Sequence, residues 1–459
     1  EFLFKIKNVI TLDADTQLPL NSARRLVGTI THPLNMPVYS PSAKRIIFGY
    51  GIIQPRITVS VEAATKSRFA HIFSGNTGFD PYTTAVSDVY QDLFREGTYT
   101  GKGLYVVDAF QMAIDDKVPE NTVLSHDLFE GCFARVGLAT NIELIDDYPA
   151  DFKCFAKRLH RWTRGDWQIA RWIFGKVPNR YGQIVQNNLP LIARWKIFDN
   201  LRRSLLAPSF LCCFLLSLTL LHGSVLAWVA IIVLILFFPV YASFLDDIRK
   251  RQENPLMEHF GNCLRSSKDR LLQNFLLLIF MPSLALSQLD AILRSIYRML
   301  ISKKKLLEWV TFSQEQGQNK KGHMRKELLL EGPIFSLMTA GVLLWARPSA
   351  LPISLPFLLL WSSAPFISRW SQQGLTRKVR PLDINEIDSY RRYARLTWHF
   401  FEKFLDIKDH WLAPDNYQED PKPVVAHKTS PTNIGLQLLA TLSAYDFGYL
   451  GLSELVEHL

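Results

Sequence analysis

Cysteine is scarce in this sequence, with five residues in a chain of 459. Their spacing matches neither a zinc site nor the framework of a disulfide-rich secreted domain. Two of them are adjacent inside an apolar stretch. We therefore expect all five to be structural, and the soluble part of the chain to face a reducing compartment. The five are Cys132, Cys154, Cys212, Cys213 and Cys263.

The sequence also lacks a secretory signal peptide and a compact basic motif with interleaved aromatic residues. The second absence argues against a nucleic-acid partner, although the formal net charge is +10. Much of the excess positive charge lies beside long apolar stretches, which is typical of bacterial inner-membrane proteins with positive loops in the cytoplasm. The chain starts at Glu1 rather than methionine and stops within a helical pattern, so we expect it to be part of a longer polypeptide.

Residues 1–188 alternate short apolar strands with helical patterns, which favours a layered α/β domain. The clearest strand covers residues 8–12, and we expect it to be buried and to deliver Asp13 and Asp15 to the edge of a sheet. We expect further strands in 46–59, 103–109 and 142–147. We expect helices in 22–31, 87–97, 110–115 and 152–175.

Residues 189–204 form the core of an amphipathic pattern that is predicted to be a helix in the bilayer interface. One face is basic and the other apolar. The basic residues are Arg194, Lys196, Arg202 and Arg203. The apolar residues are Leu191, Ile192, Trp195, Ile197, Phe198 and Leu201.

Residues 205–370 are predicted to be a membrane region with two helical hairpins. The segments 205–221 and 225–245 are each long enough to span a bilayer. The second pair, 334–346 and 351–368, is split by Arg347 and Pro348, and its first member is short.

A further apolar segment, 274–293, is interrupted by Pro282, Gln288 and Asp290 and has basic flanks on both sides. We expect it to be interfacial or re-entrant rather than a single crossing. Two hairpins then return the tail, 371–459, to the side of the first domain. In this tail we expect helices in 391–405 and 433–457, with a loop in 409–432.

Asp13 and Asp15 form an Asp-x-Asp motif that directly follows a strand. Two carboxylates in this position suit Mg²⁺ or Mn²⁺, which bridges to the oxygens of a diphosphate. The same pattern is also common in turns, where the carboxylates are simply solvated or cap the backbone.

Asp127 follows a short apolar run and Ser125-His126, and it is a candidate general base. The alternative is a helix N-cap, a position that Asp favours. His126 is a rival for the base.

Two further motifs could bind substrate. Arg161 offers a planar fork for a diphosphate, and Trp162 offers a flat face for a sugar ring. The segment from Thr100 through Gly101 to Lys102 lies in a loop whose glycines would let the backbone approach a ligand closely. The alternatives are a solvated basic helix face with core tryptophans, and a plain turn.

The order of these motifs resembles that of the processive family-two glycosyltransferases, such as cellulose and hyaluronan synthases. In that family an Asp-x-Asp motif, a Gly-containing acceptor loop, Thr/Ser-Glu-Asp and Gln-x-x-Arg-Trp precede the membrane helices. This sequence departs in two places, since His126 replaces the acidic middle residue and Arg158 replaces the Gln.

The resemblance implies a GT-A-like nucleotide-sugar transferase domain, followed by membrane helices. It assigns Asp13 and Asp15 to nucleotide and metal, and Asp127 to the general base. It places Thr100, Gly101 and Lys102 in the acceptor site. It assigns Arg158 and Arg161 to the diphosphate of the donor and Trp162 to the acceptor sugar.

Longer runs resemble the cyclic β-1,2-glucan synthases in particular, along essentially the whole chain. The runs are HPLN (32–35), QPR (54–56), SDVYQDLF (87–94), YTGKG (99–103), LSHDL (124–128), HRWTRGDWQ (160–168), WLAPDNYQED (411–420) and TSPTNIGL (429–436).

This second resemblance implies a membrane-bound, inverting transferase that takes glucose from UDP-glucose and extends a β-1,2-glucan. It implies a multi-pass protein of the bacterial inner membrane with its catalytic domain in the cytoplasm. It also implies that 371–459 begins a glycoamylase-like helical region. The first strands of the transferase and a phosphorylase-like region are expected in other parts of a larger polypeptide, so that the chain alone would have weak or no activity.

Three alternatives remain at this point. The tail residues Asp415, Glu419 and Asp420 could belong to a glycoside hydrolase or phosphorylase. A transporter or structural membrane protein would leave the order of the motifs unexplained. A synthase of another β-glucan would carry the same catalytic motifs.

Overall fold

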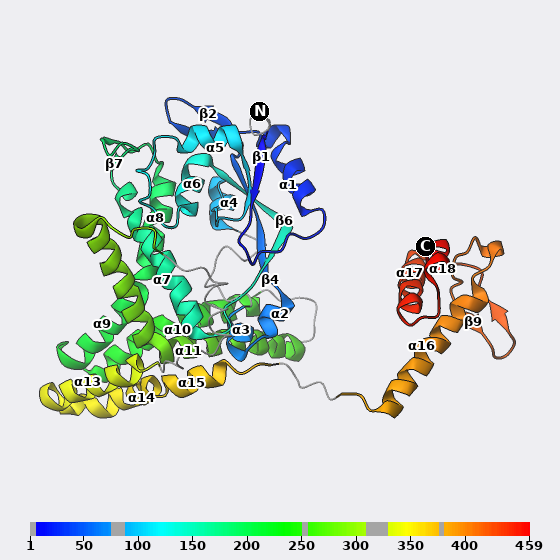
Figure 1. Ribbon diagram of the computed structural model, residues 1–459. Helices are drawn as coiled ribbons and strands as arrows, with labels where there is room; N and C mark the ends of the chain where they lie inside the picture. The colour runs from blue at the N-terminus through cyan, green and yellow to red at the C-terminus, as the bar shows by residue number, and fades with distance from the viewer. Residues whose placement is uncertain (1–5, 75–87, 250–255, 309–328, 376–380) are drawn as a thin grey trace. The chain divides into compact units, whose positions relative to one another are not determined.

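The computed structural model describes residues 6–74, 88–249, 256–308, 329–375 and 381–459. The chain divides into two compact units, Glu1–Thr376 and Arg377–Leu459, and each is described here by itself. The first unit combines a mixed α/β region with a set of apolar helices (Figure 1).

A four-stranded sheet forms the centre of the α/β region, in the order β1 (Asn8–Thr11), β5 (Gly103–Val106), β4 (Ile52–Val59) and β6 (Val136–Asp146). Strand β5 is antiparallel to both β1 and β4, whereas β4 and β6 are parallel. The ends of β1, β4 and β6 therefore lie at the same edge as the start of β5. In the sheet as described, β1 has one neighbour, and its four residues are half-buried rather than buried as predicted.

Helices cover both faces of this sheet (Figure 1). Adjacent residues of a strand point to opposite faces, and Ile52 and Ile53 of β4 accordingly enter two different hydrophobic clusters. Ile53 packs with Leu26 of α1 (Ser22–Ile30). Ile52 packs with residues of α5 (Val107–Ile114) and α6 (Asp127–Ala134). The predicted α/β layering is present in this region.

Several boundaries differ from those predicted. The strand expected in 103–109 ends at Val106, where α5 begins, and the strand expected in 142–147 starts at Val136. The helix expected in 152–175 is α7 (Phe152–Gln168), followed by a short 3₁₀ helix, η3 (Ala170–Ile173). The helix expected in 87–97 is α4 (Val89–Phe94).

The remaining elements of the α/β region are short. They are η2 (Pro33–Asn35), β2 (Val38–Ser40), β3 (Arg45–Phe48), α2 (Val61–Thr65), α3 (Arg68–Phe73), β7 (Lys176–Pro178) and β8 (Ile184–Gln186).

The predicted interfacial helix is α8 (Leu191–Ser204). Ile197 and Leu201 are buried, but Leu191, Trp195 and Phe198 are exposed. Lys196, which the sequence placed on the basic solvent face, is buried and donates from Nζ to the backbone oxygens of residues 96 and 97 at 3.0 and 2.6 Å. One face of α8 therefore belongs to the core of the α/β region. It packs apolar side chains there, and its buried Lys196 donates hydrogen bonds to two backbone carbonyls. Its placement in a bilayer interface stays a prediction.

The apolar helices follow α8. They are α9 (Leu206–Thr219), α10 (Val225–Arg249), α11 (Leu256–Tyr297), η4 (Arg298–Ser302), α13 (Glu331–Ala346), η5 (Pro348–Ala350), α14 (Leu351–Ser362) and α15 (Ala364–Ser371).

By length and composition, α10 and the stretch Ser267–Ser302 could each cross a membrane. The bent pairs α8 with α9 (46°) and η5–α14 with α15 (42°) would raise the number of candidate spans to four, counted over the described residues. Segment 274–293 lies inside the continuous helix α11, which passes through Pro282 without doubling back as a re-entrant loop would. Its position relative to a bilayer, and the predicted two-hairpin topology, stay predictions.

The second unit contains α16 (Ile384–Phe404), η6 (Ile407–Asp409), the two-stranded β9 (Tyr417–Gln418) and β10 (Val424–Val425), α17 (Pro431–Asp446) and α18 (Leu452–His458). Its small core joins Trp398 and Phe401 of α16 to Ala413 and Ala444. The two helical segments predicted here are present, but the second is divided, with Gly448 at φ +73° in the break.

Candidate active site

The first part of the site lies at the sheet edge where β1 and β6 end and β5 begins. Lys102, just before β5, places its Nζ 3.1 Å from Asp13 Oδ2 and also pairs with Asp146 at the end of β6. Lys102 and Asp146 are buried, whereas 58% of the Asp13 side chain is exposed. The hydroxyl of Thr16 donates to Asp146 Oδ1 at 2.6 Å. A buried lysine therefore ties the Asp-x-Asp segment to the sheet.

Asp15 is the second carboxylate of the motif, and its pKa is raised, chiefly because burial penalises the charged form. The neighbouring charge of Lys102 lowers this pKa, while those of Asp146 and Asp13 raise it. Asp13 and Asp146 contact the ammonium group of Lys102, and the pKa of Asp15 responds to the charges of all three. This excess of negative charge, on hard oxygen ligands, fits a divalent cation such as Mg²⁺ or Mn²⁺ at Asp13 and Asp15.

The glycine loop before β5 is the second part of the site. Gly101 has φ +86°, and a Cβ atom there would lie 2.9 Å from Asp127 Oδ1. A Cβ on Gly103 would lie 2.4 Å from the backbone oxygen of Ile53. Only glycine allows this backbone to pass so close to the carboxylate and to the neighbouring strand.

Two side chains hold the same loop in place. The backbone N–H and hydroxyl of Thr100 both donate to Oε1 of the buried Gln54, at 2.9 and 3.1 Å. The hydroxyls of Tyr99 and Thr11 share a hydrogen bond of 2.6 Å. The loop is thus fixed to β4 and β1, and the Thr100 hydroxyl already has a protein partner.

Asp127 is the first residue of α6, with 32% of its side chain exposed. Burial raises its pKa to about 6, His126 and Lys102 act to lower that value, and Glu130 and Asp13 act to raise it. A carboxylate with a pKa close to neutral is suited to accept a proton during a reaction near pH 7.

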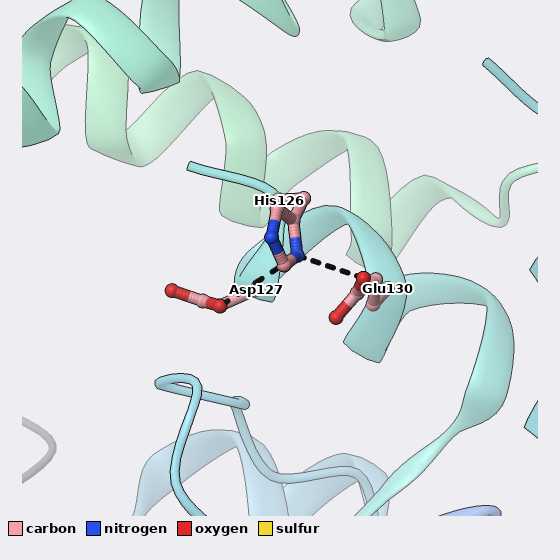
Figure 2. Close-up of side chains that lie close together, drawn as sticks. All are labelled: His126, Asp127 and Glu130. Atoms are coloured by element: carbon pink, nitrogen blue, oxygen red, sulfur yellow. Dashed lines mark ion pairs between the residues drawn. The ribbon is translucent and has the colours of Figure 1, made fainter. Parts of the chain in front are cut away.

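His126 lies between two carboxylates (Figure 2). Its Nδ1 is 2.7 Å from Glu130 Oε1 and 3.8 Å from Asp127 Oδ1. The hydrogen bond to Glu130 raises the pKa of His126 to about 9, with further support from the charges of Glu130 and Asp127.

These three side chains are close enough to share a metal ion. A protonated imidazole, however, has no lone pair to offer a metal. The arrangement therefore fits a cation held between two anions better than it fits a metal site.

Helix α7 holds the segment that leads to Asp127. A Cβ on Gly165 would lie 2.3 Å from Ser125 Cβ, so the helix touches the backbone of this segment directly. Gln168 Oε1 accepts a hydrogen bond of 2.6 Å from the N–H of Leu124. Arg161 lies one turn before Gly165, on the same face of the helix. The helix that carries Arg161 and Trp162 therefore contacts the segment just before the candidate base.

A different set of α7 side chains contacts α11 and the segment after it. His160 Nε2 is 2.8 Å from Asp290 Oδ2, and Arg294 pairs with the same carboxylate at 2.8 Å. Arg164 donates to the backbone oxygens of Glu308 and Leu306 at 2.9 and 3.3 Å. Asp290 interrupts an apolar stretch in the sequence. Its carboxylate pairs with Arg294, which is positively charged, and with His160, which is positively charged when protonated.

The structure brings Asp13, Asp15, Gly101, Lys102 and Asp127 together around one edge of the sheet. Arg158, Arg161 and Trp162 lie on α7, with the guanidinium of Arg158 4.7 Å from the centre of the Trp162 ring.

Sequence reasoning missed Asp146 and Glu130. Asp146 ends a long strand, and Glu130 lies one helical turn after His126, a spacing that could have suggested the ion pair.

The comparisons agree with the resemblance. No family model matches the chain. The chain is 37% identical over 460 residues to the cyclic beta-(1,2)-glucan synthase NdvB of Rhizobium meliloti (strain 1021). This match covers 99% of the chain but spans only 16% of the relative's length.

Proposed function

The chain is a homologue of one stretch of a cyclic β-(1,2)-glucan synthase, and from this premise we propose that it carries a glucosyltransferase site of such an enzyme. The site would transfer glucose from UDP-glucose to a growing β-1,2-glucan. The reaction would proceed with inversion at the anomeric carbon.

The observation that carries this proposal is the contact between the glycine loop and Asp127. The loop brings its backbone against the carboxylate at Gly101 and places Lys102 beside Asp13 one residue later. Asp127 as base would then act on the attacking hydroxyl, while a cation at Asp13 and Asp15 would act on the leaving diphosphate on the other side of C1, as single-displacement glycosyl transfer requires.

Asp127 would accept the proton of the acceptor's 2-hydroxyl as that oxygen attacks C1 of glucose. Because the attack displaces UDP directly, the product is a β linkage, and no covalent enzyme intermediate forms. The pKa of about 6 leaves Asp127 mostly ionised at neutral pH and still a useful proton acceptor. About a third of the Asp127 side chain is exposed, which leaves room for the hydroxyl.

The leaving diphosphate would be met at the other end of the site. Asp13 and Asp15 would hold Mg²⁺ or Mn²⁺, which neutralises phosphate charge when bound. Lys102, which the resemblance assigns to the acceptor site, pairs with Asp13 and Asp146, and we therefore propose that it acts at this end as a buried cation. Arg158 and Arg161 on α7 would supply guanidinium groups for the phosphate oxygens. Trp162 would present its ring to the acceptor sugar, while Thr100 and Gly101 would bound the acceptor site through their backbone.

The apolar helices would place this site on a lipid bilayer. We propose a multi-pass protein of the bacterial inner membrane with the α/β region in the cytoplasm. The remaining parts of a larger synthase would be further partners of this chain, since the relative is much longer.

Incorporation of labelled glucose tests this proposal, in membranes that contain the complete protein together with UDP-glucose and Mg²⁺ or Mn²⁺. We expect metal-dependent β-1,2-glucan in the wild type and a loss of 10²-fold to 10⁴-fold in Asp127→Asn, which keeps the size of the side chain but removes the base. Linkage analysis of the product distinguishes β-1,2-glucan from another β-glucan. An Asp127→Asn protein with wild-type yield would remove Asp127 from its role.

A further inference from the structure

The residue before the candidate base is unusual and has a defined structural partner. In the family-two pattern that this sequence resembles, an acidic residue precedes the catalytic Asp, whereas here the residue is His126. The ring is held by a 2.7 Å contact to Glu130 one helical turn later, and 57% of the His126 side chain is exposed. A histidine paired with Glu130 thus stands where that pattern has an acidic residue.

We infer that His126 and Glu130 form an ion pair whose imidazolium faces Asp127 and keeps that carboxylate ionised, so that both are positioning residues for the proposed transfer. This inference rests on the proposed function, because it assigns Asp127 the role of base.

The geometry gives each member a distinct role. His126 Nδ1 lies 3.8 Å from Asp127 Oδ1, close enough for a strong charge interaction without the shared proton of a short hydrogen bond. Glu130 takes the hydrogen bond from the same nitrogen and is itself largely covered. Nδ1 therefore carries its proton toward Glu130, and the positive charge of the ring remains next to Asp127.

Other charges act on Asp127 from the neighbouring elements. Lys102 in the glycine loop favours the ionised form, and Asp13 in the loop after β1 disfavours it. Helix α7 meets this segment through Gly165, while the guanidinium of Arg164 turns to the backbone oxygens of residues 306 and 308. His126, the residue just before α6, thus lies 3.8 Å from the carboxylate of Asp127, whereas Lys102 pairs with Asp13 and Asp146.

The protonation state of His126 supports the same arrangement. Its pKa of about 9 leaves the ring charged throughout the range in which Asp127 titrates. Without this charge, Asp127 would keep the carboxylates of Glu130 and Asp13 as neighbours and lose one of the two cations that favour its ionised form. A nearby opposite charge typically changes the pKa of a carboxyl group by one to three units.

The test is the pH dependence of glucan synthesis in membranes that contain the complete protein. In His126→Gln we expect the acidic limb of the pH–rate profile to move to higher pH by about one unit. The rate of this variant should therefore fall furthest below that of the wild type near pH 6, and the difference should shrink toward pH 8.5. In His126→Lys, which keeps a positive charge, the limb should return toward the wild-type position. His71→Gln, at an exposed histidine on α3, is the matched control and should keep the wild-type profile.

A double variant separates charge from shape. His126→Gln leaves Glu130 as an unpaired anion beside the base, whereas His126→Gln with Glu130→Gln removes one charge of each sign. We expect the double variant to have its acidic limb closer to wild type than the single variant. A double variant that matches His126→Gln would overturn the part assigned to Glu130.

A purely structural role for His126 would lower the rate equally at every pH and leave the acidic limb in place. That result would overturn the inference while the transferase activity and the Asp127→Asn loss still stood. If the wild type made no glucan, or if Asp127→Asn made as much as the wild type, the proposed function would be overturned and this inference with it.

Discussion

The two ends of the site hold their carboxylates in different ways. At the Asp13 end, a buried lysine contacts Asp13 and Asp146 and acts on the pKa of Asp15, and Asp13 stays open to solvent. At the Asp127 end, two glycines let backbone approach closely, and an imidazolium retained by Glu130 faces the base. The first end thus has more carboxylates than cations, whereas at the second the backbone and a histidine closely surround one carboxylate.

This difference predicts that the two ends will fail differently. The rate lost by a substitution at the Asp13 end should be partly restored by a higher concentration of Mg²⁺ or Mn²⁺. The rate lost by a substitution at the Asp127 end should depend on pH or on the displacement of the carboxylate, and added metal should not restore it.

The largest effect should come from Gly101→Ala. The new Cβ would lie 2.9 Å from Asp127 Oδ1 in a residue held at φ +86°, so the carboxylate or the loop must move. Displacements of about 1 Å in a catalytic group can cost roughly 10²-fold in rate, and we expect a loss of at least that size. Glucan synthesis at saturating UDP-glucose and metal measures it.

Gly182→Ala is the matched control for that variant. Gly182 has a similar φ of +77°, but no atom lies within 4 Å of the position of a Cβ. Strain alone would then affect both variants equally, and equal losses would contradict the contact argued for Gly101.

A smaller effect, of about 30-fold at low metal, is expected for Asp15→Asn. The amide loses one charged ligand of the proposed Mg²⁺ or Mn²⁺ site but keeps the shape of the side chain. A metal titration should show that high Mg²⁺ or Mn²⁺ restores a large part of the rate, while Asp127→Asn in parallel stays inactive. Equal rescue of both variants, or of neither, would remove the distinction between the two ends.

The smallest effect, about tenfold, is expected for Gly165→Ala. The added Cβ would meet Ser125 at 2.3 Å and shift the segment before Asp127, while a small displacement of α7 can absorb part of the change. Neither extra metal nor a change of pH should restore the rate. Gly175→Ala, where the space is open, is the control, and a loss there of similar size would show that the effect is not specific to the contact with Ser125.

Much of the fold could be predicted from local patterns. The strand before Asp13 and the helix 22–31 depend on apolar periodicity within a few residues, and they lie where they were expected. The long helix after residue 152 starts where it was expected but ends at Gln168 rather than at 175. Boundaries were less certain, since α5 begins directly at the end of β5. The continuous course of α11 through Pro282 was not predicted, because packing against several helices overrides the local break.

The residues of the site that belong to a sequence motif could be predicted. Those that reach the site only through the folding of distant segments could not. Asp13, Gly101 and Asp127 stand in recognisable patterns. Asp146 does not, since only the pairing of β6 with β4 brings it to Lys102. Lys196 gave a misleading signal, because a helix that packs on a protein core can bury a cation against free carbonyls.

The contacts of helix α7 affect how the first unit unfolds. One set of its side chains fixes the segment before Asp127, and another fixes α11 through His160 and Arg164. Both attachments come from residues 160–168 of the same helix, so unfolding of this part of α7 would release both. The α/β region and α11 should therefore share one cooperative unit, whose backbone amides become open to hydrogen exchange together rather than in separate steps.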